Sequence, residues 1–225
     1  MGNRGLFISI EGPDGSGKST VIKGIEKWIV DVVKTQCLVT KEPGSPHDKA
    51  CVEMRKLLLD PEINLVGGAE LFLMLADRVQ HVWKTLLPAL NDNKIVITDR
   101  YFDSTYAYQG WGRRNGGPAL KEIEELNNIA TSGLIPDLTI LIMVDPHVGY
   151  KRVTGRDNDK LDTFEKEKMD FREKVHHGFL DLYNKKKDSR NFFMIDSTEK
   201  SEQQCLTEVL DYLSVFIERK INLGD

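Results

Sequence analysis

The stretch EGPDGSGKST occupies residues 11–20 and directly follows an apolar run at residues 6–10. It matches the pattern G-x-x-x-x-G-K-[ST] from Gly12 to Ser19, and a helix-compatible segment continues from it. Glycines in such a loop let backbone N–H groups turn toward a phosphate, and the positive end of the helix adds to the attraction. A strand, a glycine-rich loop and a helix in this order predict a binding site for a nucleoside triphosphate.

Short apolar runs rich in β-branched residues recur along the chain. They lie at residues 6–10, 37–40, 94–98, 138–144 and 191–195. Runs of this kind are typical of strands buried on both faces, and the long connections between them suit helical crossovers between parallel strands. The sequence therefore predicts an α/β fold with a sheet of five parallel strands.

Amphipathic segments fill the connections between these runs. Apolar residues recur with helical spacing at residues 18–34, 68–90, 118–132, 163–187 and 201–220. The third segment begins at a proline and is followed by a glycine, which are typical helix start and stop signals. We expect these helices to cover both faces of the sheet.

The chain shows no internal repeat and no linker rich in Pro, Ser or Gly, so residues 1–225 are expected to form a single domain. One segment differs from the rest. The stretch TGRDNDKLDT at residues 154–163 is polar apart from Leu161 and lies between two helical segments. Because such stretches inside a compact chain usually serve function, we expect a short, mobile lid there.

Composition limits the partners of the chain. With 31 basic and 35 acidic residues the formal charge is −4, which leaves no global positive field for a nucleic acid. No apolar run approaches the ~20 residues of a membrane helix, so no membrane association is expected. Three widely separated cysteines without a C-x-x-C spacing argue against a disulfide framework and a zinc site, and indicate a reducing cytoplasm.

The end of the third predicted strand separates the classes of nucleotide-binding protein. No N-K-x-D motif that would read guanine follows a later strand, and a motor or helicase would be longer, with paired acids at a strand end. Here the strand ends in Asp99 and Arg100 instead. Asp99 can support Mg²⁺, whereas Arg100 indicates a second phosphate close by, and hence an acceptor that is itself a phosphate.

Six segments resemble, in order and spacing, the motifs of one known family. Besides residues 11–20 they are KEPG at 41–44, ADR at 76–78 with Gln80 and His81, DRY at 99–101, DSTYAYQG at 103–110 and GLIPDL at 133–138. Over residues 6–196 the chain resembles the bacterial type of thymidylate kinase, a family of P-loop nucleoside monophosphate kinases.

The resemblance implies an enzyme that transfers the γ-phosphoryl group of ATP to dTMP, which gives ADP and dTDP in the biosynthesis of dTTP. It implies the P-loop NTPase fold with a short lid, Mg²⁺ as the cofactor that accompanies ATP, a cytoplasmic location and a homodimer. ATP and dTMP would be the partners, with no nucleic acid and no membrane among them.

The first motif is expected to bind ATP. Its contributing residues are Gly12, Asp14, Gly15, Ser16, Gly17, Lys18, Ser19 and Thr20. Lys18 would reach the β and γ phosphates, and Ser19 would bind Mg²⁺ together with Asp99.

For dTMP, the resemblance assigns Arg55 and Arg100 to the acceptor phosphate, which suits a planar fork of donors. Asp14 would contact the 3′-hydroxyl of the sugar, and the ring of Tyr108 would press against C2′ and exclude a ribose hydroxyl. Glu42, in the second motif, is placed in the same site. On the residues alone, Arg55 could instead be a surface residue of a helix and Tyr108 a core residue.

The thymine base is assigned to Arg78, which would hydrogen-bond a carbonyl, and to Thr105 and Gln109, which would complete its recognition. Met74 occupies the base-stacking position, where the family usually has Phe; a thioether packs on a ring but defines its plane less firmly. An alternative for Arg78 is pairing within its own helix, with Asp77 or Glu70.

Catalysis should need no general base, because the acceptor oxygen belongs to a phosphate that is already ionised at neutral pH. We expect Lys18, Arg100 and Arg156 of the lid to act as the catalytic cations. The eukaryotic type of the family carries an arginine in the phosphate-binding loop where this chain has Gly15. An arginine at position 15 is therefore expected to restore part of the activity that is lost with Arg156.

Two other functions stay open on the residues alone. One is a kinase of another nucleotide such as dUMP, because Met74 replaces an aromatic residue. The other is a regulatory protein that binds ATP without turnover, although binding alone needs no cation in a lid. If Arg156 is not the cation delivered by the lid, Arg152 and Arg113 are the next candidates.

Overall fold

The computed structural model describes residues 4–60, 62–113, 119–155, 164 and 167–222. Its sheet consists of β1 (Phe7–Glu11), β2 (Cys37–Lys41), β3 (Ile95–Asp99), β4 (Leu138–Met143) and β5 (Phe192–Asp196). All neighbours in the order β2-β3-β1-β4-β5 are parallel. This arrangement confirms the predicted α/β fold with five parallel strands.

Helices occupy the connections between the strands. The α-helices are α1 (Lys18–Trp28), α2 (Lys49–Leu59), α3 (Gly67–His81), α4 (Leu87–Asn91), α5 (Phe102–Thr105), α6 (Leu120–Ala130), α7 (Pro146–Thr154), α8 (Met169–Lys186) and α9 (Glu202–Asn222). Wider, π-helical turns form η1 (Ile29–Val33), η2 (Val82–Leu86) and η3 (Tyr106–Gly112). Within the described ranges, none of these helices has the length and apolar character needed to cross a membrane.

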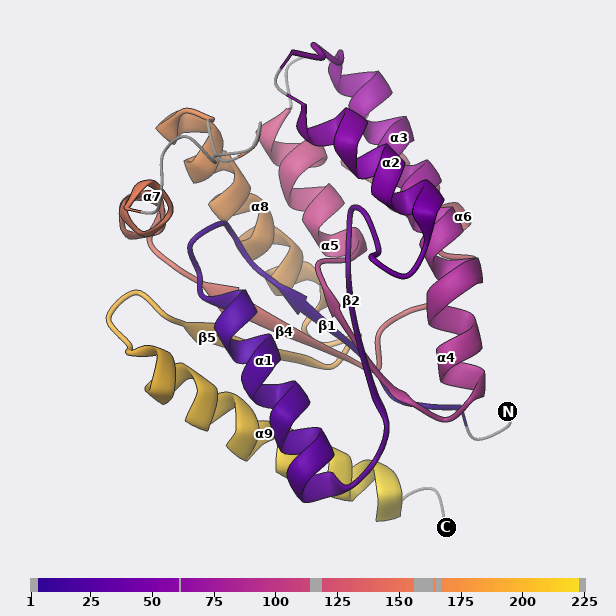
Figure 1. Cartoon of the computed structure of the whole chain (residues 1–225). Helices are drawn as coiled ribbons and strands as arrows, with labels where there is room; N and C mark the ends of the chain where they lie inside the picture. The colour runs from indigo at the N-terminus through magenta and orange to yellow at the C-terminus, as the bar shows by residue number, and fades with distance from the viewer. Residues whose placement is uncertain (1–3, 61, 114–118, 156–163, 165–166, 223–225) are drawn as a thin grey trace.

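The helices cover both faces of the sheet (Figure 1). On one face α1 and α9 pack over the central strands, and Ile25 and Leu213 meet Ile140 in a buried cluster. On the other face η3 and α8 cover β4, where Phe179 packs with Leu141. Because Ile140 and Leu141 are neighbours in β4, their side chains point to opposite faces. Each strand thus contributes to two separate cores.

The predicted helix at residues 68–90 is divided in the structure into α3, η2 and α4. Pro88 lies in the first turn of α4 and has no N–H to bond back to the preceding turn. The hydrogen bonding widens there, and the N–H of Leu87 bonds to the carbonyl of Val82, five residues back. The segment therefore keeps its helical course while its bonding pattern changes.

Three helical stretches lie outside the predicted helices, namely α2, the pair formed by α5 and η3, and α7. The predicted lid covers residues 154–163, of which only Thr154 and Gly155, at the end of α7, belong to the described residues.

Three parallel strands end together at one edge of the sheet. In the strand register Asp99 of β3 lies opposite Ile10 of β1 and opposite Lys41 of β2. The loops that follow β1, β2 and β3 therefore leave from the same edge, which is where ligands bind in open α/β sheets.

Candidate active site

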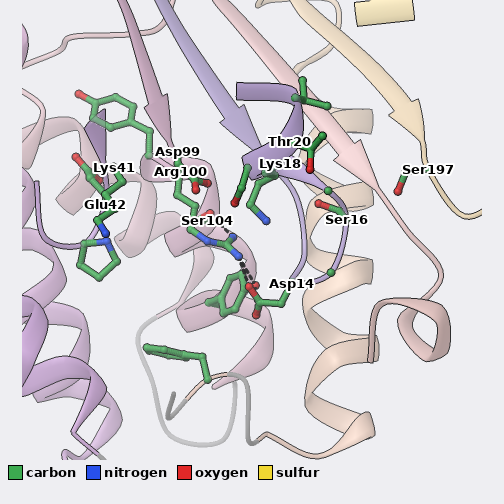
Figure 2. Close-up of a pocket in the computed structure, with 18 of the residues that line it drawn as sticks. Asp14, Ser16, Lys18, Thr20, Lys41, Glu42, Asp99, Arg100, Ser104 and Ser197 are labelled. Atoms are coloured by element: carbon green, nitrogen blue, oxygen red, sulfur yellow. Dashed lines mark hydrogen bonds and ion pairs between the residues drawn. The ribbon is translucent and has the colours of Figure 1, made fainter. Parts of the chain in front are cut away.

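A cavity of about 680 Å³ opens at this edge of the sheet (Figure 2). Of the predicted site residues, those that line it are Asp14, Gly15, Ser16, Gly17, Lys18, Ser19, Thr20, Glu42, Arg55, Met74, Arg78, Asp99, Arg100, Thr105, Tyr108 and Gln109. Gly12 contributes through its carbonyl oxygen, which accepts hydrogen bonds from two of these side chains. Arg156 lies outside the described residues.

The phosphate-binding loop has a backbone that only glycine adopts readily. Gly12 and Gly15 have φ angles of 138° and 82°. A Cβ on Gly12 would lie 2.0 Å from the carbonyl oxygen of Ile142, and one on Gly15 would lie 2.3 Å from that of Gly149. Beside Gly17, which precedes the first turn of α1, the space is open. The start of α1 is thus accessible from the cavity.

Lys18 reaches back over this loop. Its Nζ atom donates to the carbonyl oxygens of Gly12 at 3.0 Å and Pro13 at 2.9 Å. Burial, together with repulsion from Arg100, lowers the pKa of Lys18 to about 8. The ammonium group is therefore held at the mouth of the loop. A phosphate that binds there would bring a negative charge close to Lys18 and favour its protonated form.

Arg100 contacts both the phosphate-binding loop and the helical segment that follows β3 (Figure 2). Its Nη1 donates to the carbonyl of Gly12 at 2.9 Å and to the hydroxyl of Ser104 at 3.0 Å. Its Nη2 donates to the Tyr108 hydroxyl at 2.9 Å and to the carboxylate of Asp14. Burial alone would raise the pKa of Asp14, but attraction by Arg100 and Lys18 and the hydrogen bond from Tyr108 together hold that pKa below its usual value. Asp14 is thus a charged partner of the arginine.

Glu11, at the end of β1, anchors the segment that follows β3. Its carboxyl oxygens accept from the backbone N–H of Tyr101 at 2.8 Å and from the hydroxyl of Ser104 at 2.6 Å. Burial, and after it the carboxylate of Asp103, raises the pKa of Glu11 to about 8. These bonds hold the chain around Arg100, whose φ of 70° is unusual for a residue with a side chain.

Oxygen atoms suited to a divalent cation lie beside the loop. Ser19 is exposed in the first turn of α1, and Asp99 ends β3. Among the described residues Asp99 Oδ1 and Ser16 Oγ are buried without a hydrogen-bond partner. In the same part of the chain no three His, Cys, Asp or Glu side chains are arranged to hold a metal. The donor set fits Mg²⁺, which commonly takes one or two protein ligands and the rest from phosphates and water.

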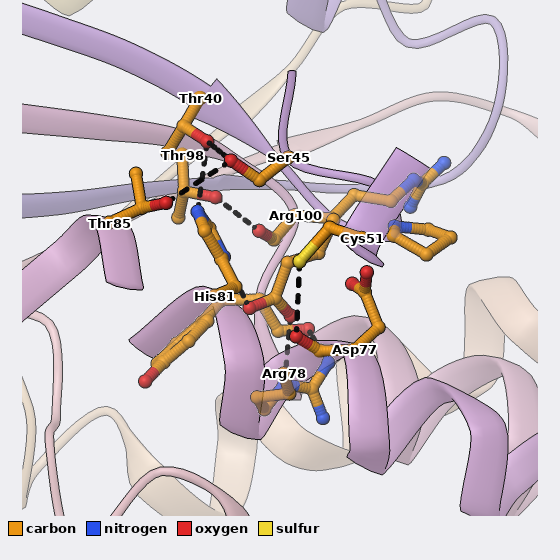
Figure 3. A network of polar contacts seen from close by, with 12 residues as sticks. Thr40, Ser45, Cys51, Asp77, Arg78, His81, Thr85, Thr98 and Arg100 are labelled. Atoms are coloured by element: carbon orange, nitrogen blue, oxygen red, sulfur yellow. Dashed lines mark hydrogen bonds and ion pairs between the residues drawn. The ribbon is translucent and has the colours of Figure 1, made fainter. Parts of the chain in front are cut away.

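Arg78 lines the cavity and is buried in a network of polar contacts (Figure 3). Its Nε donates to Glu42 at 2.8 Å, its Nη1 to Thr105 Oγ1 at 2.9 Å and to Asn127 Oδ1, and its Nη2 to the carbonyl of Tyr101 at 3.1 Å. Four of its five N–H groups are thereby used. The fifth, on Nη2, is not engaged by any described residue.

Glu42 holds Arg78 from behind. One carboxyl oxygen accepts from Arg78, and the other lies 2.8 Å from His81 Nδ1, whose ring bonds through Nε2 to Thr40 at 2.8 Å (Figure 3). Burial would raise the pKa of Glu42, but Arg78 and His81 together lower that pKa below its usual value. Both oxygens of Glu42 are engaged, so it orients Arg78. Arg78 pairs with neither Asp77 nor Glu70 of its own helix, which were the alternatives suggested by the sequence.

The loop after β2 positions Arg55. Both carboxyl oxygens of Asp77 accept from the backbone N–H of Gly44 at 3.1 Å. Burial, followed by the charge of Glu42, raises the pKa of Asp77 to about 6. The Nη1 atom of Arg55 donates to the carbonyl of Pro43 at 2.8 Å, and the side chain lines the cavity. Arg55 is therefore part of the cavity wall.

An apolar wall lines one side of the cavity, beside Arg100 and Asp14. The Tyr108 ring stands edge-on to Phe164, Phe171 and Phe179, with centroids 6.0, 6.0 and 6.2 Å away. Met74 packs against the same cluster. Tyr108 therefore belongs to the core and also lines the cavity, whereas its contact with the sugar stays a prediction.

Of the further cations considered, Arg152 is the one that reaches the phosphate-binding loop within the described residues. From α7 it donates to the carbonyl of Gly15 at 3.3 Å and to that of Ser197 at 2.9 Å. Arg113 instead forms salt bridges with two carboxylates and does not line the cavity. Arg156 falls outside the described residues, and its role remains a prediction.

The buried groups that hold the site without being among the predicted residues include Glu11, His81 and Asn127. Glu11 directly precedes the first glycine of the loop, and His81 lies within a quoted motif, so a signal existed for both. Asn127 lies 49 positions from Arg78 and carries no local signal.

A glycine-rich phosphate loop between a parallel strand and a helix, facing an arginine-lined acceptor end, defines a P-loop nucleotide kinase. The family model described as thymidylate kinase matches residues 10–208. The chain belongs to the thymidylate kinase family, and it is an enzyme that phosphorylates dTMP.

Individual relatives agree with this assignment. The chain is 43% identical to a thymidylate kinase of Carboxydothermus hydrogenoformans over 200 residues, which covers 89% of this chain and 93% of that protein. It is 38% identical to a thymidylate kinase of Lactobacillus helveticus, with 97% and 98% covered. The crystal structure of thymidylate kinase from Ehrlichia chaffeensis superposes with a TM-score of 0.70 at 28% identity, with 93% and 98% covered.

Proposed function

We propose that the cavity binds ATP at the phosphate-binding loop and dTMP at the end that carries Arg78, and transfers the γ-phosphoryl group between them. One observation carries this proposal: the loop, Arg100 and Arg78 line a single cavity. A phosphate bound at the loop and a nucleotide held by the arginines would then face each other across Arg100, in the arrangement that direct transfer needs.

On the ATP side, the accessible start of α1 and the N–H groups of the loop would cradle the phosphates. Lys18 would leave the carbonyls of Gly12 and Pro13 to contact the β and γ phosphates. Arg152 lies beside Gly15 and is the cation of α7 nearest to the loop among the described residues. The lid residue Arg156 is proposed as the cation that arrives on closure.

The Ser19 hydroxyl and the Asp99 carboxylate would hold Mg²⁺ that enters with ATP. When bound there, the ion would neutralise charge on the transferring phosphoryl group. Asp99 also carries a buried oxygen without a partner among the described residues, as expected for a group that awaits a cation.

On the acceptor side, Arg100 and Arg55 would bind the dTMP phosphate. Because that phosphate is already ionised, these residues orient it in line with ATP and no proton has to be removed. Asp14 is hydrogen-bonded to Arg100 and Tyr108 and would contact the sugar 3′-hydroxyl.

The base end would be read by three residues. Arg78 has one N–H left for a carbonyl of the base, and Thr105 and Gln109 line the same part of the cavity. Met74 would pack on the ring from the apolar wall. The tight packing around Tyr108 suits the exclusion of a ribose hydroxyl.

A homodimer is the remaining part of the proposal. Phe72, Val79 and Trp83 are exposed apolar residues of α3 and η2, and their spacing of seven and four residues places them on one stripe. Ile129 on α6 is also exposed. A second copy of the chain would cover such a stripe, and the working location would be the cytoplasm.

An ADP-release assay with dTMP, dUMP, dGMP and thymidine tests the function. We expect fast turnover with dTMP, slower turnover with dUMP, and none above background with dGMP or thymidine. Equal rates with all four, or release that ignores the acceptor, would contradict the proposal. A preference for dUMP over dTMP would instead support the kinase of another nucleotide.

A further inference from the structure

Gln109 is held in one orientation by a residue outside the cavity. In η3, Gln109 is only 3% exposed and lines the cavity. Its Nε2 donates to Glu70 Oε1 at 2.9 Å. Glu70 lies in the first turn of α3, is also buried, and is not part of the cavity wall.

A carboxylate decides which way the amide faces. The nitrogen and oxygen of a glutamine amide have nearly the same shape, so only their hydrogen bonds fix the orientation. An ionised carboxylate accepts hydrogen bonds and donates none. Nε2 must therefore face Glu70, and Oε1 is left on the other edge of the amide. The reverse orientation would bring two acceptor oxygens together in a buried site.

Glu70 is itself held firmly. Arg113 donates to it from Nε at 3.3 Å and from Nη2 at 3.2 Å, both to Oε2. Arg113 also pairs with Glu167, and its guanidinium lies 4.7 Å from the centre of the Phe171 ring. Glu167 and the Phe171 ring thus fix the arginine, and the arginine fixes the carboxylate that orients Gln109.

Glu70 lies on the same side of α3 as two residues that line the cavity. Glu70, Met74 and Arg78 are spaced by four residues, so they lie along one side of the helix. Arg78 retains one N–H donor, and Gln109 retains its amide oxygen, which accepts no bond from the described residues. The cavity therefore presents a donor and an acceptor to the base.

We propose that Glu70 is a positioning residue for base selection: it fixes the Gln109 oxygen toward the cavity and thereby selects a keto-pyrimidine over an amino-pyrimidine. Thymine and uracil offer a carbonyl oxygen beside an N–H, which complements a donor and an acceptor. Cytosine offers an amino group beside a bare ring nitrogen, which mismatches both. This inference rests on the proposed function and names the residue that sets its selectivity.

The unmodified enzyme gives the first test. dUMP and dCMP both lack the thymine methyl group, so their inhibition constants against dTMP isolate the keto-amino difference. With two mismatched hydrogen bonds, dCMP should bind about 100-fold more weakly than dUMP. Similar inhibition constants would overturn the proposal without any substitution. Absence of dTMP phosphorylation by the unmodified enzyme would instead show that the proposed function has failed.

The second test replaces the carboxylate. Glu70→Gln can offer either an oxygen or a nitrogen to Gln109, so both orientations become available. We expect KM for dTMP to rise about tenfold and the inhibition constant for dCMP to fall, with KM for ATP unchanged. The matched control is Glu125→Gln, an exposed glutamate of α6, which should change none of these values. An unchanged ratio between dCMP and dTMP would overturn the proposal.

Two further variants separate positioning from a structural role. Glu70→Asp stays an acceptor and should keep the discrimination against dCMP even if dTMP binds more weakly. In a Gln109→Leu background, Glu70→Gln should change the dCMP to dTMP ratio no further, because the group through which Glu70 acts is gone. An additional change in that background would show that Glu70 acts by another route.

Discussion

A Cβ atom on Gly15 would lie 2.3 Å from the carbonyl oxygen of Gly149, so the phosphate-binding loop touches the first turns of α7 with no room between them. Gly15 also has a φ of 82°, which side-chain-bearing residues rarely adopt. The expectation that an arginine at position 15 could stand in for Arg156 therefore conflicts with the structure.

Arg156→Ala is predicted to lower kcat much more than it changes either KM, because the contact would be made only in the closed complex. Adding Gly15→Arg should not restore kcat, and should lower the melting temperature. Steady-state kinetics and thermal unfolding of the single and double variants check this. Recovery of kcat in the double variant would show that α7 can move away from the loop.

Lys18→Ala is predicted to abolish nearly all turnover while the protein stays folded. The lysine bonds only to loop carbonyls, and the charge that it brings to a transferring phosphate is worth about 3–5 kcal/mol of barrier. Lys23→Ala, an exposed lysine one turn further along α1, is the control. A Lys18 variant with more than about a tenth of the normal kcat would contradict the assignment of the loop.

Arg78→Ala is predicted to raise KM for dTMP strongly and KM for ATP little, because Arg78 lies at the acceptor end. It should also destabilise the fold by about 3–5 kcal/mol, since a buried Glu42 loses its charged partner. Urea unfolding and kinetics with each substrate varied give both numbers. Arg219→Ala, an exposed arginine of α9, should have neither effect. Equal changes in the two KM values would mean that Arg78 is only structural.

Met74→Phe is predicted to leave dTMP binding unchanged or to improve it, because a ring stacks with a more defined geometry than a thioether. Calorimetric titration with dTMP measures the change. Met194→Phe, at an exposed position of β5, is the control. A large loss of affinity would show that Met74 fills space that the Phe164 cluster cannot share.

Stability should fall as pH rises from about 4.5 to 8. The folded protein keeps the Glu11 proton up to about pH 8, whereas Glu11 of the unfolded chain loses it near its ordinary pKa of 4.5. In that window the folded state binds more protons, so the free energy of unfolding decreases with pH. Glu11→Gln should flatten this slope in thermal unfolding scans, and Glu26→Gln, exposed on α1, should not.

The fold was predictable because strands and helices leave local patterns of apolar residues in the sequence. The five apolar runs became the five strands within one residue or so at each end, since burial on both faces leaves little choice of residue. The division of the helix at residues 68–90 was harder to predict. Proline often ends a helix, whereas here the chain stays helical around Pro88 with a changed hydrogen-bonding pattern.

The site was predictable at the residues that face the cavity and much less so behind them. Lys18 and Arg100 lie in short sequence motifs whose residue types suit phosphate binding. Asn127 accepts from Arg78 across 49 positions, a contact that depends on the packing of α6 against α3 and leaves no local pattern. Glu42 shows the same limit, because its motif places it at the site but only the structure shows that both oxygens are already engaged.

The hydrogen bonds that join Arg78 to Glu42 and Asn127 also constrain how such an enzyme could be redesigned or could diverge toward another base. A substitution at position 78 alone would leave the Glu42 carboxylate without its cation and the Asn127 side-chain carbonyl without its donor. The single substitution would therefore lower stability before it gave a new base preference. A library that varies positions 42, 78 and 127 together would avoid that loss. New specificities should therefore emerge as sets of linked substitutions, and a stabilised parent protein would make the intermediate steps accessible.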